Sequence, residues 1–127
     1  MSLAQQGIQA RHQSALDQGR FLIQHCGACD RHIYFPRELC PHCGALAPDL
    51  VATAGSGTVH AVTVMYRRAE QGGHHAICLV DLVEGVRLMS RVEGLAPEAV
   101  TVGLRVRARV QVRDGRGLVV FDAEPAP

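Results

Sequence analysis

Apolar and polar residues alternate with a period of two along much of the chain from residue 56 onward, a pattern typical of half-buried β-strands. The clearest example is residues 104–113, where small apolar side chains alternate with arginines. Glycine-rich sequences separate the runs and predict turns. We therefore expect five strands, at residues 58–66, 76–83, 86–92, 104–113 and 118–123.

Five strands, with a short helical turn at residues 96–100 between the third and the fourth, follow the order of an OB-fold barrel. A jelly-roll fragment or an SH3-like barrel would accept the same runs, so the strand pattern alone leaves these alternatives open.

The N-terminal part follows a different pattern. Residues 3–18 place a few apolar side chains at helical spacing and predict a weakly amphipathic helix that ends at Gly19. Its apolar stripe is thin, so we expect the helix to rest on a neighbouring element or on a partner. Apolar runs at 21–23 and 33–35 predict two strands, and residues 45–55 read as a connector with a short strand at 50–52.

Four cysteines form two C-x-x-C pairs separated by ten residues: Cys26, Cys29, Cys40 and Cys43. A two-residue gap lets both sulfurs of a pair reach one cation, and two pairs complete the tetrahedron that Zn²⁺ prefers. Such a closed site is structural. Iron accepts the same four thiolates, so a rubredoxin-type iron centre stays open. Gly27, Pro41 and Gly44 are turn formers that suit the tight turns of these pairs.

Two disulfides or a redox pair are the competing interpretations of the cysteines. The first residues lack the pattern of a secretory signal, and no stretch approaches 18 uninterrupted apolar residues, so we predict a cytoplasmic protein. Thiols stay reduced in the cytoplasm, which favours ligands over bridges.

The sequence predicts no catalytic residues. The fifth cysteine, Cys78, lies in the middle of an apolar strand, where a thiol is buried and inert. His25, His32 and His42 flank the metal cysteines, which already complete the site, so we expect these histidines to donate to sulfur or water. No paired carboxylates or triad emerges.

An arginine row on the fourth strand is the strongest polar feature of the second half. Arg105, Arg107 and Arg109 suit the phosphates of coenzyme A, and they equally suit the rim of a partner interface or a solvated strand face. We take them as candidate cofactor-binding residues.

The combination of both halves resembles a known family. The segment GRFLIQHCGACDRHIYFPRELCPHCGA, the opening GSGTV of the barrel and the hairpin DLVEGVRLMSR are similar to proteins that join a rubredoxin-like zinc ribbon to an OB-fold and are associated with acyl-CoA metabolism. We expect a helix at 1–19, the zinc ribbon at 20–47, the OB-fold at 48–124 and a tail at 125–127.

This resemblance implies a mostly β, zinc-stabilised, non-catalytic accessory subunit of an acyl-CoA-processing complex. Its partner would be a thiolase-fold, hydratase or aldolase subunit. The assembly would be a hetero-oligomer, or the chain would form a homodimer. The resemblance also implies that the chain could bind acyl-CoA. Residues 8–16 of the helix, with Ile33, Tyr34 and Phe35, are the expected apolar anchors for that partner.

Two other classes of function stay open. Zinc ribbons and OB-folds both occur in single-stranded nucleic-acid binders, but a net charge of +1 and an aromatic content of 4% argue against such a role. Independent catalysis would need Cys78 or the histidines to form a site with residues of a partner.

Overall fold

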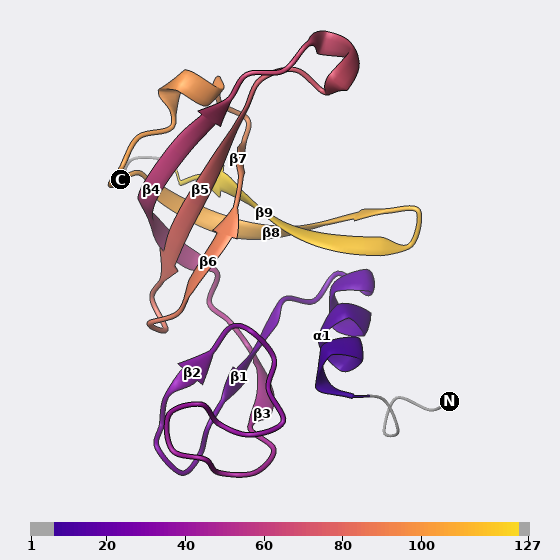
Figure 1. Ribbon diagram of the computed structural model, residues 1–127, viewed down its shortest axis with the longest axis vertical. Helices are drawn as coiled ribbons and strands as arrows, with labels where there is room; N and C mark the ends of the chain where they lie inside the picture. The colour runs from indigo at the N-terminus through magenta and orange to yellow at the C-terminus, as the bar shows by residue number, and fades with distance from the viewer. Residues whose placement is uncertain (1–6, 125–127) are drawn as a thin grey trace. The chain divides into compact units, whose positions relative to one another are not determined.

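The computed structural model describes residues 7–124, and their Cα positions group into two compact units (Figure 1). Of the described residues, the first unit comprises 7–54, 84–86 and 110–118, and the second comprises 55–83, 87–109 and 119–124. Two predictions, the start of the helix at residues 3–6 and the tail at 125–127, lie outside the described residues.

The first unit contains one helix and a three-stranded antiparallel sheet. Its elements are α1 (Ile8–Asp17), β1 (Leu22–His25), β2 (His32–Ile33) and β3 (Asp49–Ala52), and the strand order is β2-β1-β3. The predicted strands are therefore present, each within a few residues of its expected position.

The helix ends as its sequence predicts. Gly19 has a φ of 83° and follows the last turn, where its amide donates to the carbonyl of Leu16 at 2.8 Å. The amide of Arg20 donates to the carbonyl of Ala15, also at 2.8 Å. These two bonds form a Schellman motif, which requires the left-handed conformation that glycine adopts without a steric penalty.

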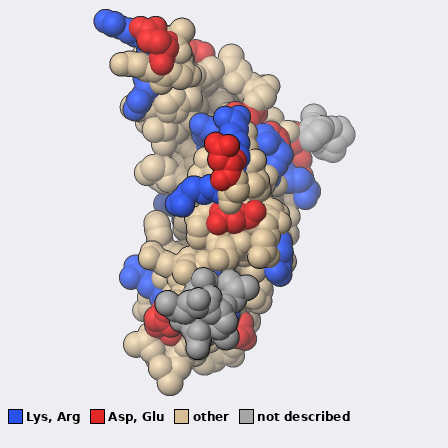
Figure 2. Space-filling model, turned by 90° about the vertical axis from the view of Figure 1, so that its right-hand side faces the viewer, with Lys and Arg blue, Asp and Glu red and all other residues tan. Residues whose placement is uncertain are grey.

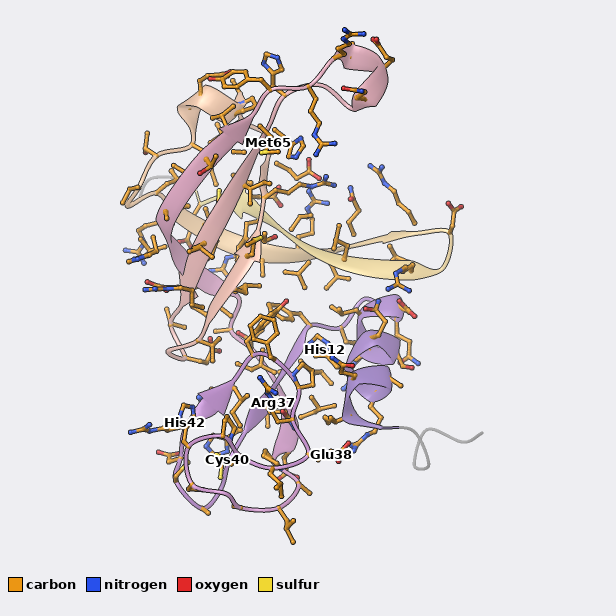
Figure 3. The ribbon with its side chains drawn as sticks, viewed as in Figure 1. His12, Arg37, Glu38, Cys40, His42 and Met65 are labelled. Atoms are coloured by element: carbon orange, nitrogen blue, oxygen red, sulfur yellow. The ribbon has the colours of Figure 1, made fainter. Side chains whose placement is uncertain are left out.

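The beginning of the helix depends on a residue far away in the sequence. Gly7 precedes α1 and has no side chain to cap it. Instead, the Glu38 carboxylate accepts a hydrogen bond from the amide of Ile8 at 3.1 Å. The negative charge also lies at the positive end of the helix dipole. Figure 3 labels Glu38, which belongs to the ribbon segment before the second cysteine pair.

The second unit is built on a β-sheet. The elements of this sheet and its connections are β4 (Ser56–Met65), the 3₁₀ turn η2 (Ala69–Gln71), β5 (His75–Leu82), β6 (Arg87–Ser90), β7 (Val92–Glu93), the 3₁₀ turn η3 (Pro97–Ala99), β8 (Arg105–Arg113) and β9 (Arg116–Ala123). Residues 110–118 of β8 and β9 are assigned to the first unit. The strand order is β6-β5-β4-β8-β9-β7. The short turn predicted between the third and fourth runs is present as η3.

The third predicted run, residues 86–92, divides into two strands, β6 and β7. β6 pairs with β5, whereas β7 pairs in parallel with β9, so the run bends at Arg91. The carbonyl of Arg91 accepts from the amide of Phe121 at 3.0 Å, and the hydroxyl of Ser90 donates to the carbonyl of Val119 at 2.8 Å. Because β6 and β7 are the two ends of the strand order, one bent run leads from one edge of the sheet to the other.

The core of the second unit is aliphatic, as the alternation predicts. Its fully buried side chains are Val59, Cys78, Val80, Leu88, Val106, Val120 and Phe121. Gly57 has a packing role, because a Cβ there would lie 2.8 Å from a methyl group of Val80 and 2.9 Å from the carbonyl oxygen of Asp81. No helix among the described residues is long and apolar enough to cross a membrane.

Candidate metal centre and charged surfaces

The two cysteine pairs lie in two turns with the same backbone geometry. The amide of Asp30 donates to the carbonyl of Cys26 at 2.7 Å, and the amide of Gly44 donates to that of Cys40 at 2.8 Å. In each turn the residue after the second cysteine has a positive φ, 63° at Asp30 and 81° at Gly44. Gly27, which we expected to serve the first turn, does not have a positive φ.

The four metal-ligand candidates converge as predicted in space, with all sulfur atoms within 4.8 Å of one another. The Sγ atoms of Cys26 and Cys43 are 3.6 Å apart, and those of Cys29 and Cys40 are 3.7 Å apart. A disulfide would need about 2.05 Å. Four sulfurs at about 2.3 Å from a tetrahedral ion lie about 3.8 Å from one another. The sulfur spacing therefore fits a single tetrahedral ion and does not fit disulfides.

The backbone around the second pair favours a thiolate. Burial opposes ionisation of Cys40, but hydrogen bonds from the backbone of His42 and Cys43, together with the neighbouring thiols, lower the pKa of Cys40 to about 7. A thiolate is the form that binds a metal. Figure 3 labels Cys40 and His42 within this ribbon.

The ring nitrogens of two of the flanking histidines contact other side chains instead of sulfur. His25 Nε2 lies 2.7 Å from the carboxylate of Asp30, and the rings of His25 and His32 are 4.9 Å apart. His42 Nδ1 lies 3.2 Å from the guanidinium of Arg31. These contacts orient the two cysteine turns without adding a ligand.

Gln24 supports the metal site through hydrogen bonds, a role that the sequence analysis did not predict. Its side chain is 1% exposed in β1, and its amide nitrogen donates to the carbonyls of Arg37 at 2.8 Å and Pro48 at 3.2 Å. Its oxygen accepts from the amide of Arg37 at 2.7 Å. Gln24 thus ties the segment before the second cysteine pair to β1. The only signal in the sequence is a polar residue within an apolar strand.

Cys78 lies in the centre of β5, where it pairs with Val62 on β4 and Ser90 on β6. Its side chain is buried, and burial raises the pKa of the thiol. Apart from the four clustered cysteines, the described residues contain no group of three side chains that could hold a metal.

The arginine row is placed on β8, and each of its members faces a carboxylate. Arg105 and Arg107 lie 3.7 Å and 3.0 Å from the carboxylate of Glu124, and Arg109 forms two hydrogen bonds with Asp122 at 2.8 Å and 3.2 Å. The Arg109 hydrogen bond lowers the pKa of Asp122. A cavity of about 420 Å³ lies at this pairing, and Figure 2 shows basic and acidic side chains interleaved on one face of the molecule. Phosphate binding by this row stays a prediction.

The expected apolar anchors are mostly unavailable to a partner. Ile8, Leu16 and Ile33 are buried within the first unit. Tyr34 is half-buried and makes edge contacts with Phe21 and Phe35, with ring centroids 6.5 Å and 5.2 Å apart. Phe35, which is 64% exposed, remains accessible.

A four-cysteine ribbon followed by an OB-type sheet defines a class of two-part proteins, and the comparisons with known proteins agree. The model of the ChsH2 rubredoxin-like zinc ribbon domain matches residues 13–49, and that of the ChsH2 C-terminal OB-fold domain matches residues 50–111. The chain belongs to this ChsH2 family of DUF35 proteins. The resemblance inferred from the sequence and the predicted fold class are thereby confirmed.

Similar proteins have been characterised to different extents. A chain of the structure described as the Ltp2-ChsH2(DUF35) aldolase is 31% identical, with a TM-score of 0.81, over 94% of this chain and 97% of that one. A DUF35 protein of unknown function from Sulfolobus solfataricus, 19% identical with a TM-score of 0.65, shares the fold over 91% of this chain and 84% of its own.

Two relatives are known by sequence. A probable enoyl-CoA hydratase alpha subunit of Thermomonospora curvata is 35% identical over 94 residues, which are 72% of this chain and 30% of that protein. A DUF35 domain-containing scaffold protein of Methanocaldococcus jannaschii is 29% identical over 106 residues, 77% of this chain and 72% of its own length. The chain thus spans less than a third of the Thermomonospora curvata protein.

Proposed function

We propose that this chain is a zinc-stabilised accessory subunit of an acyl-CoA-processing complex, with a thiolase-fold aldolase or a hydratase subunit as its partner. The observation that carries the proposal is the TM-score of 0.81 to a DUF35 chain of an aldolase, over 97% of that chain. The relatives described as a hydratase alpha subunit and a scaffold protein support the same class of role.

Cys26, Cys29, Cys40 and Cys43 would hold the zinc ion. The sulfur spacing supports a four-thiolate site, and four protein ligands leave no coordination position for substrate. The ion therefore supplies stability rather than chemistry. It adds to a small apolar core, in which one buried cluster consists of Cys26, Ile33 and Cys40, with Cys29 and Ala45 packed against it.

The partner would supply the bond-making residues. The thiol of Cys78 is buried in a strand, and burial favours its protonated, unreactive form. The carboxylate of Asp122 forms an ion pair with Arg109, which lowers the pKa of Asp122 and holds it in the ionised form, away from general-acid chemistry. These features support a scaffold or channel-shaping role.

The test is to assay the chain alone and together with a thiolase-fold or hydratase subunit that copurifies with it. We expect no thioester turnover by the isolated chain, a stable complex by size-exclusion chromatography, and turnover of acyl-CoA by that complex. Acyl-CoA turnover by the chain alone would contradict the proposal. So would tight binding of single-stranded DNA that falls steeply as salt rises, since that would identify a nucleic-acid-binding module.

A further inference from the structure

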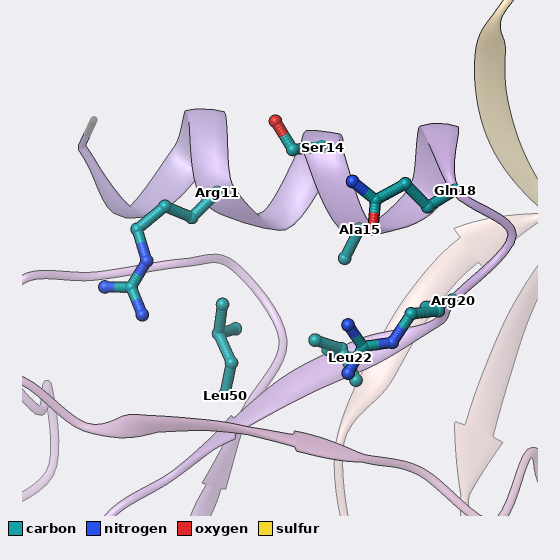
Figure 4. A pocket seen from close by; sticks show the side chains of 7 residues that line it. All are labelled: Arg11, Ser14, Ala15, Gln18, Arg20, Leu22 and Leu50. Carbon is teal, nitrogen blue, oxygen red and sulfur yellow. The ribbon is translucent and has the colours of Figure 1, made fainter. Parts of the chain in front are cut away.

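A groove lies within the first unit between α1 and the sheet formed by β1 and β3 (Figure 4). Its floor is apolar and is formed by Ala15, Leu22 and Leu50. Figure 4 shows Arg11 at one end and Arg20 at the other, with Gln18 beside Arg20. We call this feature the α1 groove. None of the residues that line it is acidic.

The two arginines of the α1 groove differ from the arginines of β8. Arg105, Arg107 and Arg109 face carboxylates, whereas neither Arg11 nor Arg20 makes an ion pair or a side-chain hydrogen bond with any described residue. Both are exposed. Two guanidinium groups without internal anions, placed around an apolar floor, are complementary to an occupant that is apolar in the middle and negative at its ends.

The size of the α1 groove decides between a small molecule and a protein segment. Its volume is about 290 Å³. Pockets that enclose drug-sized ligands measure roughly 300–1,000 Å³. An acyl-CoA, with its nucleotide and pantetheine parts, exceeds a drug-sized ligand, so this groove is too small to enclose one. It is large enough for one or two side chains of a partner protein.

We infer that the α1 groove is a docking site for an acidic segment of the partner subunit, in which an apolar side chain lies between two carboxylates. The inference rests on the proposed function, because it needs a protein partner. Arginine is enriched at protein interfaces, where it combines charge with apolar contact along its stem.

The helix sets the length of the groove. Arg11 on α1 and Gln18, the residue that follows the last residue of α1, are seven residues apart, so the groove runs about 10 Å along the helix axis. An extended segment covers that distance in about three residues, at roughly 3.3 Å each. A partner segment that lies along the groove therefore needs an apolar residue flanked on both sides by acidic residues.

The test uses the full chain and its copurifying partner subunit. In the variant Arg11→Glu/Arg20→Glu, repulsion replaces attraction, and we expect the Kd for the partner to rise about tenfold or more at low salt. The affinity of the wild type should fall as salt rises, whereas that of the variant should not fall, because salt screens the repulsion that the new glutamates introduce. Arg11→Lys/Arg20→Lys keeps both charges and should stay within about threefold of the wild type. Isothermal titration calorimetry at two salt concentrations measures all of these.

The matched control is Arg67→Glu/Arg68→Glu, which makes the same change of charge at two other exposed arginines that have no ion pair with a described residue. It should bind the partner like the wild type. Circular dichroism and zinc content verify that every variant is folded. An unchanged Kd in the Arg11/Arg20 variant, or an equal loss in the control, would overturn the inference.

Two further outcomes would also overturn it. If the Arg11/Arg20 variant altered the oligomeric state of the isolated chain and left partner binding intact, the occupant would be a second copy of this chain. If the wild-type chain formed no complex with any such subunit, the proposed function would be refuted. The docking site, which depends on it, would then be refuted as well. If the complex forms and the Arg11→Glu/Arg20→Glu variant binds the partner with an unchanged Kd, only the docking site is refuted and the proposed function stands.

Discussion

At the scale of single residues, the two cysteine turns show how one backbone geometry accepts different residues. Asp30 and Gly44 hold equivalent positions at φ values of 63° and 81°. Glycine adopts this conformation freely, whereas most residues lose about 1–2 kcal/mol there. Aspartate is among the better tolerated exceptions, because its short polar side chain bonds locally, and here its carboxylate contacts His25 at 2.7 Å.

Gly44→Ala should therefore lower the free energy of unfolding of the ribbon by about 1–2 kcal/mol, since a Cβ at that φ is strained. Gly27→Ala is the matched control. Gly27 has no positive φ, and a Cβ there meets nothing within 4 Å, so this change should be neutral or stabilise by about 0.4–1 kcal/mol. Urea denaturation of the zinc-loaded protein measures both. Equal losses in the two variants would contradict the turn geometry.

His12 makes the stability of the first unit depend on pH. Its ring is partly buried on α1, 6.2 Å from the ring of Tyr34, and its Nε2 is buried with no hydrogen-bond partner (Figure 3). Burial lowers the pKa of His12, and a hydrogen bond to the backbone of Leu22 offsets this only in part. In the unfolded chain the pKa is about 6.5, so the unfolded state binds more protons as pH falls.

The stability that neutral His12 gives the folded first unit should be fully present above about pH 6.5. It should be lost as pH falls from that value through the lower pKa of His12 in the folded state. The replacement His12→Phe keeps an aromatic ring and removes the titration. We expect the difference in unfolding free energy between wild type and His12→Phe to change between pH 7.5 and pH 5. Urea titrations with saturating zinc measure it. A difference that stays constant with pH would show that His12 does not titrate in this way.

At the scale of elements, α1 depends on its surroundings. It has ten residues and no side-chain cap of its own. An isolated helix of fewer than about 12 residues is marginal in water. The Glu38 carboxylate, the burial of Ile8 and Leu16, and the Schellman ending therefore stabilise a helix that its own sequence supports weakly.

Glu38→Ala should destabilise the beginning of α1 by about 1 kcal/mol, the usual cost of losing a helix cap. Hydrogen exchange at the amides of Ile8 and Gln9 should become faster, while that of β4 and β5 stays unchanged. Glu38→Gln keeps an acceptor oxygen and should destabilise the beginning of α1 less than Glu38→Ala does. Glu70→Ala, which removes a carboxylate that caps nothing, is the control. Unchanged exchange at Ile8 in Glu38→Ala would refute the capping role.

At the scale of the whole molecule, the two units have cores of different kinds. The second unit buries aliphatic side chains and Phe121 between its strands, whereas the buried apolar side chains of the ribbon are few: Ile23, Ile33 and two of its own cysteines. So small an apolar cluster does not offset the entropy of ordering the ribbon, and metal binding worth about 10–16 kcal/mol would replace it.

Cys40→Ser should therefore abolish zinc binding and unfold the ribbon, while the strands of the second unit persist. Elemental analysis should find one zinc per wild-type chain and less than a tenth of that in the variant. Hydrogen exchange should show loss of protection in β1 to β3 and retention in β4 and β5. Cys78→Ala serves as the control and should keep its zinc. An absence of any metal in the wild type, or disulfides by mass spectrometry, would contradict the zinc site.

Much of this architecture follows from local sequence. The two C-x-x-C pairs predict that four sulfurs meet, and the period-two alternation predicts the strands, because ligand spacing and side-chain alternation are properties of a few consecutive residues. The class of function was predicted from the resemblance of both halves to one family, because neither half alone defines that class. The domain boundaries and the roles of the arginines stay predictions.

What only the tertiary structure decided depends on contacts between residues far apart in the chain. The sequence placed Arg105, Arg107 and Arg109 on one strand face, but pairing with β9 brought Asp122 and Glu124 to them. It marked the apolar residues of α1 and the ribbon as anchors, but packing buried most of them and left Arg11 and Arg20 exposed around a groove. Charge pairing and burial are set by which elements meet, and no local pattern records that.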